Sequence, residues 1–382
     1  MTESNYLKEV REQYEDYPYP LRDPEDEKQR LRPTDLELLD YLNFKCFEGR
    51  QSFNGFRALV AGGGTGDAAI FLAEQLRDRD AEVVYLDLSG ASRAIAEERA
   101  RVRGLENLTW LQGSILDIPE MDLGEFDYIN CSGVLHHLAS PVAGLRALGS
   151  VLKDDGCMGL MLYATIGRTA IYQMQDLLRL VKTEESSVQG KIDNARTLLE
   201  NLPPSNWLKL AEKLMPAEHI NHGDAGVYDA FLHQQDRAYT VPELFDYIDE
   251  CDLRFVDFSH NRTWRYRPET YLKEPALLQK INRLPIETQY AIAELTAGNI
   301  LMHVFYVAKT RKTPARLTNL DNVPVFYGYP LDCVALSREM QKHPGRELTL
   351  SPTPDRRIVI PPGKFTHLVF RHLDGQRSLR KI

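Results

Sequence analysis

Short apolar runs alternate with amphipathic stretches from about residue 56 to residue 164. Residues 56–62 (FRALVAG) form an apolar run that ends at glycine, the pattern of a buried strand. Residues 65–79 follow with apolar side chains at helical spacing. The same alternation predicts further strands at 81–89, at 108–116, within 126–138 and at 157–164, and further helices at 92–105 and 141–156. Five strands alternating with helices indicate an α/β fold with a doubly wound, mostly parallel sheet.

The pattern changes after Ala164. Helical periodicity dominates residues 167–250, and strand-like runs return only at 253–260 and 301–310. We expect both runs to rejoin the sheet at its edge, and we expect residues 167–250 to form a helical insertion over the strand ends. The helical runs within this insertion are 170–181, 191–202, 207–215 and 241–250.

From Lys312 the chain turns to prolines and short β-like stretches such as RELTLS and RRIVIPP, followed by a helical run near the end. These features predict a small β-rich C-terminal domain. We therefore expect an N-terminal cap segment over residues 1–50, a main domain over 51–310 that carries the insertion, and the small domain over 311–382.

Composition narrows the class of protein. Of 382 residues, 43% are hydrophobic and 26% charged, which is ordinary for a globular protein with a sizeable core. The net charge of −9 disfavours a nucleic-acid partner. No stretch reaches the roughly 18 apolar residues of a membrane span, so no membrane association is expected. Five scattered cysteines without a CxxC pair favour a reducing, cytoplasmic location.

The strongest chemical signal is the loop VAGGGTGD at residues 60–67, between a predicted strand and a predicted helix. Its glycines allow a tight turn and a close ligand, and the helix start offers free N–H groups. Asp87 ends the next strand, 21 residues after Gly66, where a carboxylate accepts hydrogen bonds from ribose hydroxyls. Together they indicate an adenosine-containing ligand, and both nicotinamide dehydrogenases and methyltransferases fit.

The order of segments separates these two classes. After the glycine loop and Asp87 come LQGSILDIP, then FDYINCSGVLHHL, then a helix, a KDDG turn and a strand. Across residues 50–165 this series resembles the class I S-adenosylmethionine-dependent methyltransferases, and it disfavours a dehydrogenase. The resemblance implies a seven-stranded Rossmann-like sheet completed by residues 253–310, S-adenosylmethionine as cofactor, and methyl transfer as the reaction.

The resemblance also implies which residues contact the cofactor. The loop glycines would meet its methionine part, Asp87 its ribose, and residues 114–115 its adenine. The cofactor-binding residues implied are Gly62, Gly63, Gly64, Gly66, Asp67, Asp87, Leu88, Ser114, Ile115, Cys131 and Ser132. Val60 and Ser114 stand where the family often has acidic residues, which leaves open a second function as an S-adenosylmethionine-binding regulatory protein without turnover.

Two histidines and an N-terminal tyrosine cluster are the catalytic candidates. His136 and His137 follow the fourth strand, at the sheet edge where ligands bind, and would act as a general base or orient the cofactor. In the family a segment ahead of the first strand commonly folds over the cofactor, and YEDYPYP (14–20) matches such a cap. Tyr17 and Tyr19 are then catalytic candidates and Tyr14 a substrate contact; the alternative is that the rings only pin the N-terminus to the domain.

The acceptor pocket is expected to draw on the insertion. Arg168 and Tyr172 follow the fifth strand, where an arginine would hold an acidic group of the substrate. His233 and Arg237 belong to a polar stretch, residues 218–240, that forms either a substrate lid or a helix-capping loop. Its histidines and acids match no tight ligand spacing, so no metal is predicted.

The expected acceptor is a small molecule or a protein side chain. The run RTWRYRPETY at residues 262–271 interleaves cations with aromatic rings, a pattern that can bind nucleic acid. One such run on an acidic protein makes RNA a less favoured acceptor. Homo-oligomer formation stays open.

Overall fold

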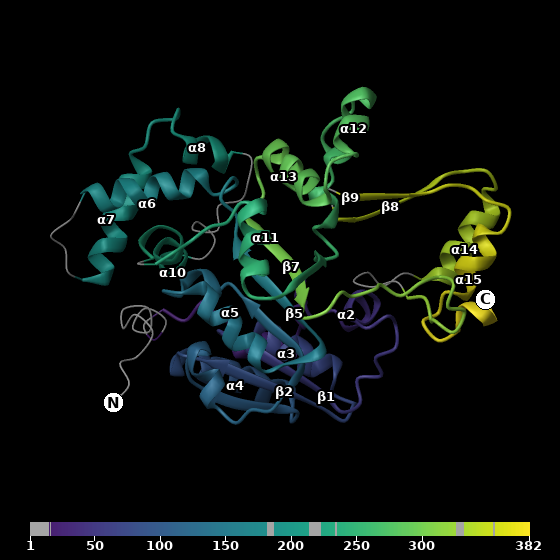
Figure 1. Cartoon of the computed structure of the whole chain (residues 1–382), viewed down its shortest axis with the longest axis horizontal. Helices are drawn as coiled ribbons and strands as arrows, with labels where there is room; N and C mark the ends of the chain where they lie inside the picture. Colours follow the sequence, from purple (N-terminus) through teal and green to yellow (C-terminus); the bar gives the residue numbers. More distant parts are fainter. Residues whose placement is uncertain are drawn as a thin grey trace. The chain divides into compact units, whose positions relative to one another are not determined.

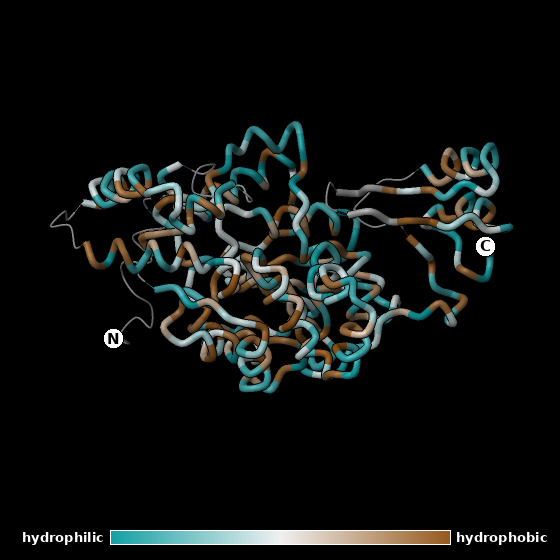
Figure 2. The backbone as a smooth tube through the Cα atoms, turned by 90° about the horizontal axis from the view of Figure 1, so that it is seen from above, coloured by the Kyte–Doolittle hydropathy of each residue, from teal (hydrophilic) through white to brown (hydrophobic). Residues whose placement is uncertain are grey.

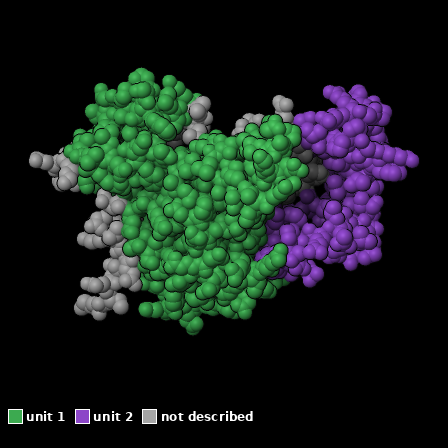
Figure 3. Space-filling view, turned by 45° about the horizontal axis from the view of Figure 1, so that its top comes forward, with its two compact units in different colours: residues 1–37, 53–311 green, residues 38–52, 312–382 purple. Residues whose placement is uncertain are grey.

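The computed structural model describes residues 15, 17–181, 187–213, 223–233, 235–325, 332–353 and 356–382. The chain divides into two compact units (Figure 3). The larger contains residues 1–37 and 53–311, and the smaller contains residues 38–52 and 312–382. The N-terminal segment expected over residues 1–50 is therefore shared between the two units.

The larger unit is built on a seven-stranded sheet with strand order β3-β2-β1-β4-β5-β7-β6. Its strands β1, β2, β5 and β7 are labelled in Figure 1. The strands β1 to β5 run parallel, whereas β7 is antiparallel to both of its neighbours. The expected seven-stranded, doubly wound sheet is confirmed. Of the two later strands expected at its edge, only β6 lies there, because β7 pairs between β5 and β6. The strands are β1 (Phe56–Ala61), β2 (Ala81–Asp87), β3 (Leu108–Gln112), β4 (Phe126–Ser132), β5 (Leu152–Tyr163), β6 (Arg254–Phe258) and β7 (Met302–Ala308).

Helices between the strands begin and end at local sequence signals. In α4 the side chain of Ser89 accepts from the N–H of Ser92, and Gly104 ends the helix in the left-handed conformation. The helix expected over 141–156 ends at Ser150 instead, because Leu152 already pairs with Phe126 in the sheet. The flanking helices are α3 (Asp67–Gln75), α4 (Gly90–Arg103), α5 (Pro141–Ser150), α11 (Val241–Glu250), α12 (Pro275–Ile281) and α13 (Ile286–Ala297).

One continuous hydrophobic core joins one face of the sheet to its helices. Side chains of β4 and β5, such as Ile129 and Leu160, pack there with α5 and α11. Figure 2 shows apolar stretches converging on the interior of this unit. The carboxyl ends of five parallel strands are thereby held at one edge, which is where ligands bind in open α/β sheets.

The helical insertion has a small core of its own. Met174, Ile192 and Phe231 are buried in it, and Tyr17 from the N-terminal segment packs against it. In contrast, α11, at the end of the expected insertion, packs on the sheet. The elements of the insertion are α6 (Thr169–Val181), α7 (Val188–Glu200), α8 (Trp207–Glu212), α10 (Gly223–Val227) and η4 (Tyr228–Leu232).

The smaller unit combines helices with the expected pair of strands. Strands β8 (Leu348–Thr353) and β9 (Arg356–Ile360) form an antiparallel hairpin. Its helices are α2 (Leu39–Cys46), α14 (Cys333–Lys342) and α15 (Thr366–His372). Among the described residues of the whole chain, no helix has the length and apolar character needed to cross a membrane.

A buried charge network attaches the N-terminal segment to the sheet. Glu27 lies in η1 (Pro24–Lys28), and its carboxylate accepts from Arg99 at 2.7 Å and from Arg103 at 2.7 Å. The Arg99 and Glu27 side chains are both only 1% exposed. Arg99 also donates to Asp67 at 2.8 Å, so the network reaches the start of α3.

We predict that Arg99→Met lowers the free energy of unfolding of the larger unit by about 3–5 kcal/mol. The change leaves the buried Glu27 carboxylate with Arg103 as a cationic partner but without Arg99. Urea unfolding followed by tryptophan fluorescence measures the loss. Arg101→Met is the matched control, since Arg101 lies two residues further along α4 and pairs with Glu98 in solvent. Equal effects of the two variants would show that the buried network contributes nothing specific.

Candidate functional site

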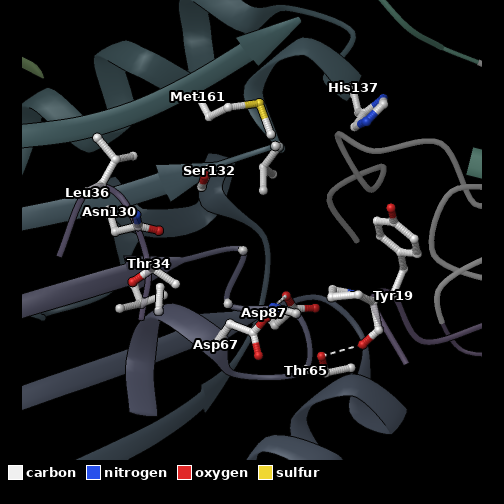
Figure 4. A pocket seen from close by; sticks show the side chains of 18 of the residues that line it. Tyr19, Thr34, Leu36, Thr65, Asp67, Asp87, Asn130, Ser132, His137 and Met161 are labelled. Atoms are coloured by element: carbon white, nitrogen blue, oxygen red, sulfur yellow. Dashed lines mark hydrogen bonds between the residues drawn. The ribbon is translucent and has the colours of Figure 1, made fainter. Parts of the chain in front are cut away.

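A cavity of about 520 Å³ lies at the carboxyl ends of the parallel strands (Figure 4). All of its lining residues belong to the larger unit. The glycine loop follows β1, Asp87 ends β2, Ser114 follows β3, Ser132 ends β4, and Tyr163 ends β5. Each parallel strand therefore delivers a residue to the same cavity.

The glycine loop is held in its turn by close contacts with Val134 and Tyr85. Gly62 has φ 73°, and a Cβ added there would lie 2.3 Å from a methyl group of Val134. Gly66 has φ 99° and precedes the first turn of α3, where free N–H groups attract negative charge. The Tyr85 hydroxyl donates to the carbonyl of Gly64 at 2.6 Å. These contacts hold the loop against β2 and leave its backbone lining the cavity.

Asp87 connects the loop to the start of α4. One of its oxygens accepts from the Gly64 N–H at 2.7 Å, and the other accepts from the Ser89 N–H at 2.8 Å. Burial raises the pKa of Asp87, against the effect of these hydrogen bonds. Each carboxylate oxygen retains a second lone pair, so both can still accept from a ligand hydroxyl.

Most of the cofactor contacts expected from the sequence line this cavity. Two do not: Gly66 packs against Ala96, and the Cys131 side chain is buried in the core. The Ser114 hydroxyl oxygen accepts from the Leu116 N–H and so starts a short helix. The expected residues that line the cavity are Gly62, Gly63, Gly64, Asp67, Asp87, Leu88, Ser114, Ile115 and Ser132.

Asp67 lies at the cavity wall between two arginines. Arg22 donates to it at 2.6 Å and Arg99 at 2.8 Å. Burial opposes ionisation of Asp67, but the two guanidinium groups hold its pKa below the usual value. The carboxylate therefore connects the N-terminal segment to the loop more directly than it faces a ligand.

The N-terminal segment covers part of the glycine loop. Tyr19 and Pro20 line the cavity, and the Thr65 hydroxyl donates to the carbonyl of Pro20 at 2.6 Å (Figure 4). Tyr17 instead stacks on Tyr228 of the insertion, with ring centroids 6.2 Å apart. Tyr14 lies outside the described residues.

Of the two candidate histidines, His137 lines the cavity and His136 is fully buried beside it. Their ring centroids are 4.2 Å apart, and His137 stacks on His233 at 3.8 Å. Burial lowers the pKa of His137 to about 4, and burial together with the neighbouring His137 and Arg168 also lowers the pKa of His136. Both imidazoles are therefore neutral near pH 7.

The expected substrate contacts from the insertion do not line the cavity. Arg168 is buried, its guanidinium lies 3.5 Å from the centroid of the Tyr163 ring, and it approaches Asp236 at 3.8 Å. The Tyr172 hydroxyl donates to Asp236 at 3.3 Å. His233 stacks on His137, while Arg237 lies over the ring of Tyr239. These four side chains therefore lie outside the cavity lining, to which His137 and Tyr163 belong.

Some cavity residues were not anticipated from the sequence. Glu37 is buried, accepts from the Tyr128 hydroxyl at 3.1 Å, and also accepts from the Asn130 amide. Burial raises the pKa of Glu37 to about 7, despite these hydrogen bonds. Asp229 of η4 also lines the cavity, where it accepts from the Tyr163 hydroxyl at 3.1 Å. No motif marks Glu37, because it lies in an irregular segment far from its partners in sequence.

A sequence model of a methyltransferase domain matches residues 59–158, which span the glycine loop, Asp87 and the strand before His136. The chain contains a class I S-adenosylmethionine-dependent methyltransferase domain. The fold is similar to that of a solved structure of PKMT2 from Rickettsia typhi in complex with AdoHcy, at a TM-score of 0.59. That similarity covers 86% of this chain and 64% of the other, at 15% sequence identity, and thus concerns the fold.

Sequence relatives extend the match beyond the domain. An uncharacterized protein of Synechococcus is 31% identical over 256 residues, which cover 66% of this chain and 60% of the relative. A ubiquinone biosynthesis O-methyltransferase of Acinetobacter baumannii is 25% identical over 144 residues, which cover 37% of this chain and 57% of the relative. The chain thus spans about three fifths of the length of these relatives.

The raised pKa of Glu37 predicts how the stability of the fold depends on pH. A carboxyl group whose pKa is higher in the folded state stabilises the fold below the unfolded pKa, and that contribution is lost as pH rises through about 7. Glu37→Gln keeps an acceptor for Tyr128 and Asn130 without a charge. We expect the variant to be more stable than wild type at pH 8 by about 1–3 kcal/mol and to lose this advantage near pH 5.

Melting temperatures of both proteins at pH 5 and pH 8 measure this difference. Glu125→Gln serves as the control, since Glu125 is exposed. The stability difference between variant and wild type should favour the variant more at pH 8 than at pH 5. The opposite trend would show that Glu37 is not a buried carboxyl that is protonated in the folded state.

Proposed function

We propose that this protein is an S-adenosylmethionine-dependent methyltransferase that acts on a small-molecule or protein side-chain acceptor. One observation carries the proposal: a single cavity joins the glycine loop and Asp87 to side chains from three other elements. These are Tyr19 of the N-terminal segment, Tyr163 at the end of β5, and Asp229 of the insertion. The cavity volume of about 520 Å³ is within the usual range for small-molecule sites.

The residues around the loop suit this cofactor. When bound, S-adenosylmethionine supplies an electrophilic methyl group on a positively charged sulfur. The loop backbone and the start of α3 would bind the methionine carboxylate, and Asp87 would bind the ribose hydroxyls through its remaining lone pairs. Leu88 and Ile115 would offer apolar contact to the adenine, with Ser114 at its edge. Both the matched methyltransferase model and the AdoHcy complex of the Rickettsia typhi protein support this choice.

Methyl transfer depends mainly on positioning the acceptor in line with the methyl group. Tyr19 and Tyr163 would orient the acceptor through their hydroxyl groups, and the Asp229 carboxyl would contact its polar atoms. His137 has a pKa of about 4, which makes it a weak proton acceptor at pH 7. Its neutral ring suits polar contact or coordination better than proton removal.

The cofactor assignment predicts the effect of Asp87→Ala. This change removes the acceptor of the ribose hydroxyls and releases the Gly64 N–H, so affinity for S-adenosylhomocysteine should fall about 10- to 100-fold. Calorimetric titration of wild type and variant measures the change. Asp122→Ala is the control, since Asp122 is exposed and outside the cavity lining.

Unchanged affinity in Asp87→Ala would remove Asp87 from the site while leaving the family assignment intact. Wild-type protein that is stabilised by NAD and not by S-adenosylhomocysteine would overturn the cofactor proposal. Tight binding without methyl transfer to any tested amine, hydroxyl or thiol acceptor would favour the regulatory, non-catalytic alternative.

The N-terminal segment predicts a second effect, on turnover. Tyr19→Ala removes a ring from the cavity wall without touching the Arg22–Asp67 ion pair, so kcat/KM should fall about 10-fold or more while the melting temperature is preserved. Leu21→Ala is the matched control, because Leu21 is 70% exposed and lies two residues away. Equal kinetics of the two variants would reduce Tyr19 to a packing residue.

A further inference from the structure

We propose that His136, His137 and Asp236 form a binding site for a divalent first-row transition-metal ion, such as Zn²⁺ or Fe²⁺, beside the acceptor end of the cavity. One ligand atom from each side chain lies within 4.8 Å of the other two. Two imidazoles and one carboxylate form a donor set that both ions accept. The proposal goes beyond methyl transfer, because the site would bind its ion with or without the cofactor.

The ring nitrogens of the two histidines are available for coordination. Nδ1 of His137 contacts the Gln235 carbonyl at 2.9 Å, which requires a proton on Nδ1 and leaves the Nε2 lone pair free. This arrangement is typical of metal ligands, whose second nitrogen donates to a backbone carbonyl. Nε2 of His137 and both nitrogens of His136 are buried without a hydrogen-bond partner among the described residues. The rings are 6% and 0% exposed, so leaving these nitrogens unpaired has a high free-energy cost.

The carboxylate is oriented by its neighbours. The Tyr172 hydroxyl donates to one oxygen of Asp236 at 3.3 Å, and the Gln175 amide donates to the other at 3.2 Å. The Asp236 side chain has no exposed surface. Ligand atoms around one ion at about 2.0–2.2 Å lie about 3–3.5 Å apart, so small rotations of the three side chains complete the geometry.

The local charge favours a cation over an anion. Two buried carboxyl groups, Asp229 and Asp236, share one buried cation, Arg168. The cluster thus contains two acidic side chains and one basic side chain, a composition that suits a bound cation. An anionic acceptor group at Arg168 is the competing occupant, and it would add to the negative charge.

The position of the site connects it to the cavity. His137 lines the cavity and appears at its wall in Figure 4, whereas His136 and Asp236 lie outside the lining. Tyr163, whose ring lies 4.0 Å from that of His136 between centroids, faces the same cavity. An ion at these residues would have open coordination positions for a donor atom of the acceptor.

The test uses the whole 382-residue chain, freed of metal by chelator dialysis. Titration with Co²⁺, followed by visible absorption and by Zn²⁺ competition, should show one ion per chain. His136→Gln and Asp236→Asn should each weaken binding by about 10- to 100-fold. His343→Gln and Asp224→Asn are the matched controls and should bind as wild type does, since His343 is an exposed residue of the smaller unit and Asp224 pairs with Arg196 in the insertion.

Near-UV circular dichroism of each variant checks that it is folded, and the melting-temperature shift with S-adenosylhomocysteine reports separately on the cofactor site. Wild-type protein that binds neither Co²⁺ nor Zn²⁺ would overturn the proposal, as would full-affinity binding by folded Asp236→Asn. Stabilisation of wild type by a small carboxylate such as acetate, without metal binding, would assign the cluster to an anionic acceptor group instead.

Discussion

The buried guanidinium of Arg99 is the interaction on which the arrangement of the site depends. It donates to the carboxylate of Glu27, to the carbonyl of Thr65 and to the carboxylate of Asp67, so every one of its nitrogens has a partner. Helix α4, the glycine loop and the N-terminal segment therefore meet at one side chain. A buried charge tolerates little displacement from its partners, because any gap would cost its full desolvation energy.

The cavity follows from this constraint. With the start of α3 held by Arg99, the glycine loop keeps its turn against β2, and Asp87 closes it by accepting from the Gly64 N–H. The same network brings Tyr19 and Pro20 over the loop, where Thr65 donates to the Pro20 carbonyl. A segment some 40 residues ahead of the loop thus becomes a wall of the cavity.

A second buried polar cluster, around His136 and Arg168, contrasts with the first. Both contain charged groups removed from water, but several nitrogens of the second cluster have no hydrogen-bond partner within the described part of the chain. Networks that only stabilise a fold are normally fully paired. When buried polar atoms beside a cavity have no hydrogen-bond partner in the protein, a bound ligand can supply one. The unpaired nitrogens therefore suit the second cluster to ligand binding, whereas the fully paired first cluster has a structural role.

Local sequence patterns were sufficient to predict the architecture of the methyltransferase domain. The alternation of apolar runs and helical faces predicted the five parallel strands, and VAGGGTGD with Asp87 predicted the sheet edge at which the cavity lies, because both depend on residues close together in sequence. The helix after residue 141 was predicted six residues too long, because its end is set by the pairing of Leu152 with Phe126, a contact between strands.

Only the tertiary structure decided which polar side chains share the cavity. Glu37 reaches Asn130 and Tyr128 across more than 90 residues, and no spacing rule predicts such a contact. Arg168 and His233 have the residue types of substrate contacts, yet they pack behind His137 and Tyr163 because the insertion folds on its own small core. The sequence by itself determined the sheet and its glycine loop, whereas long-range packing determined which side chains face the cavity.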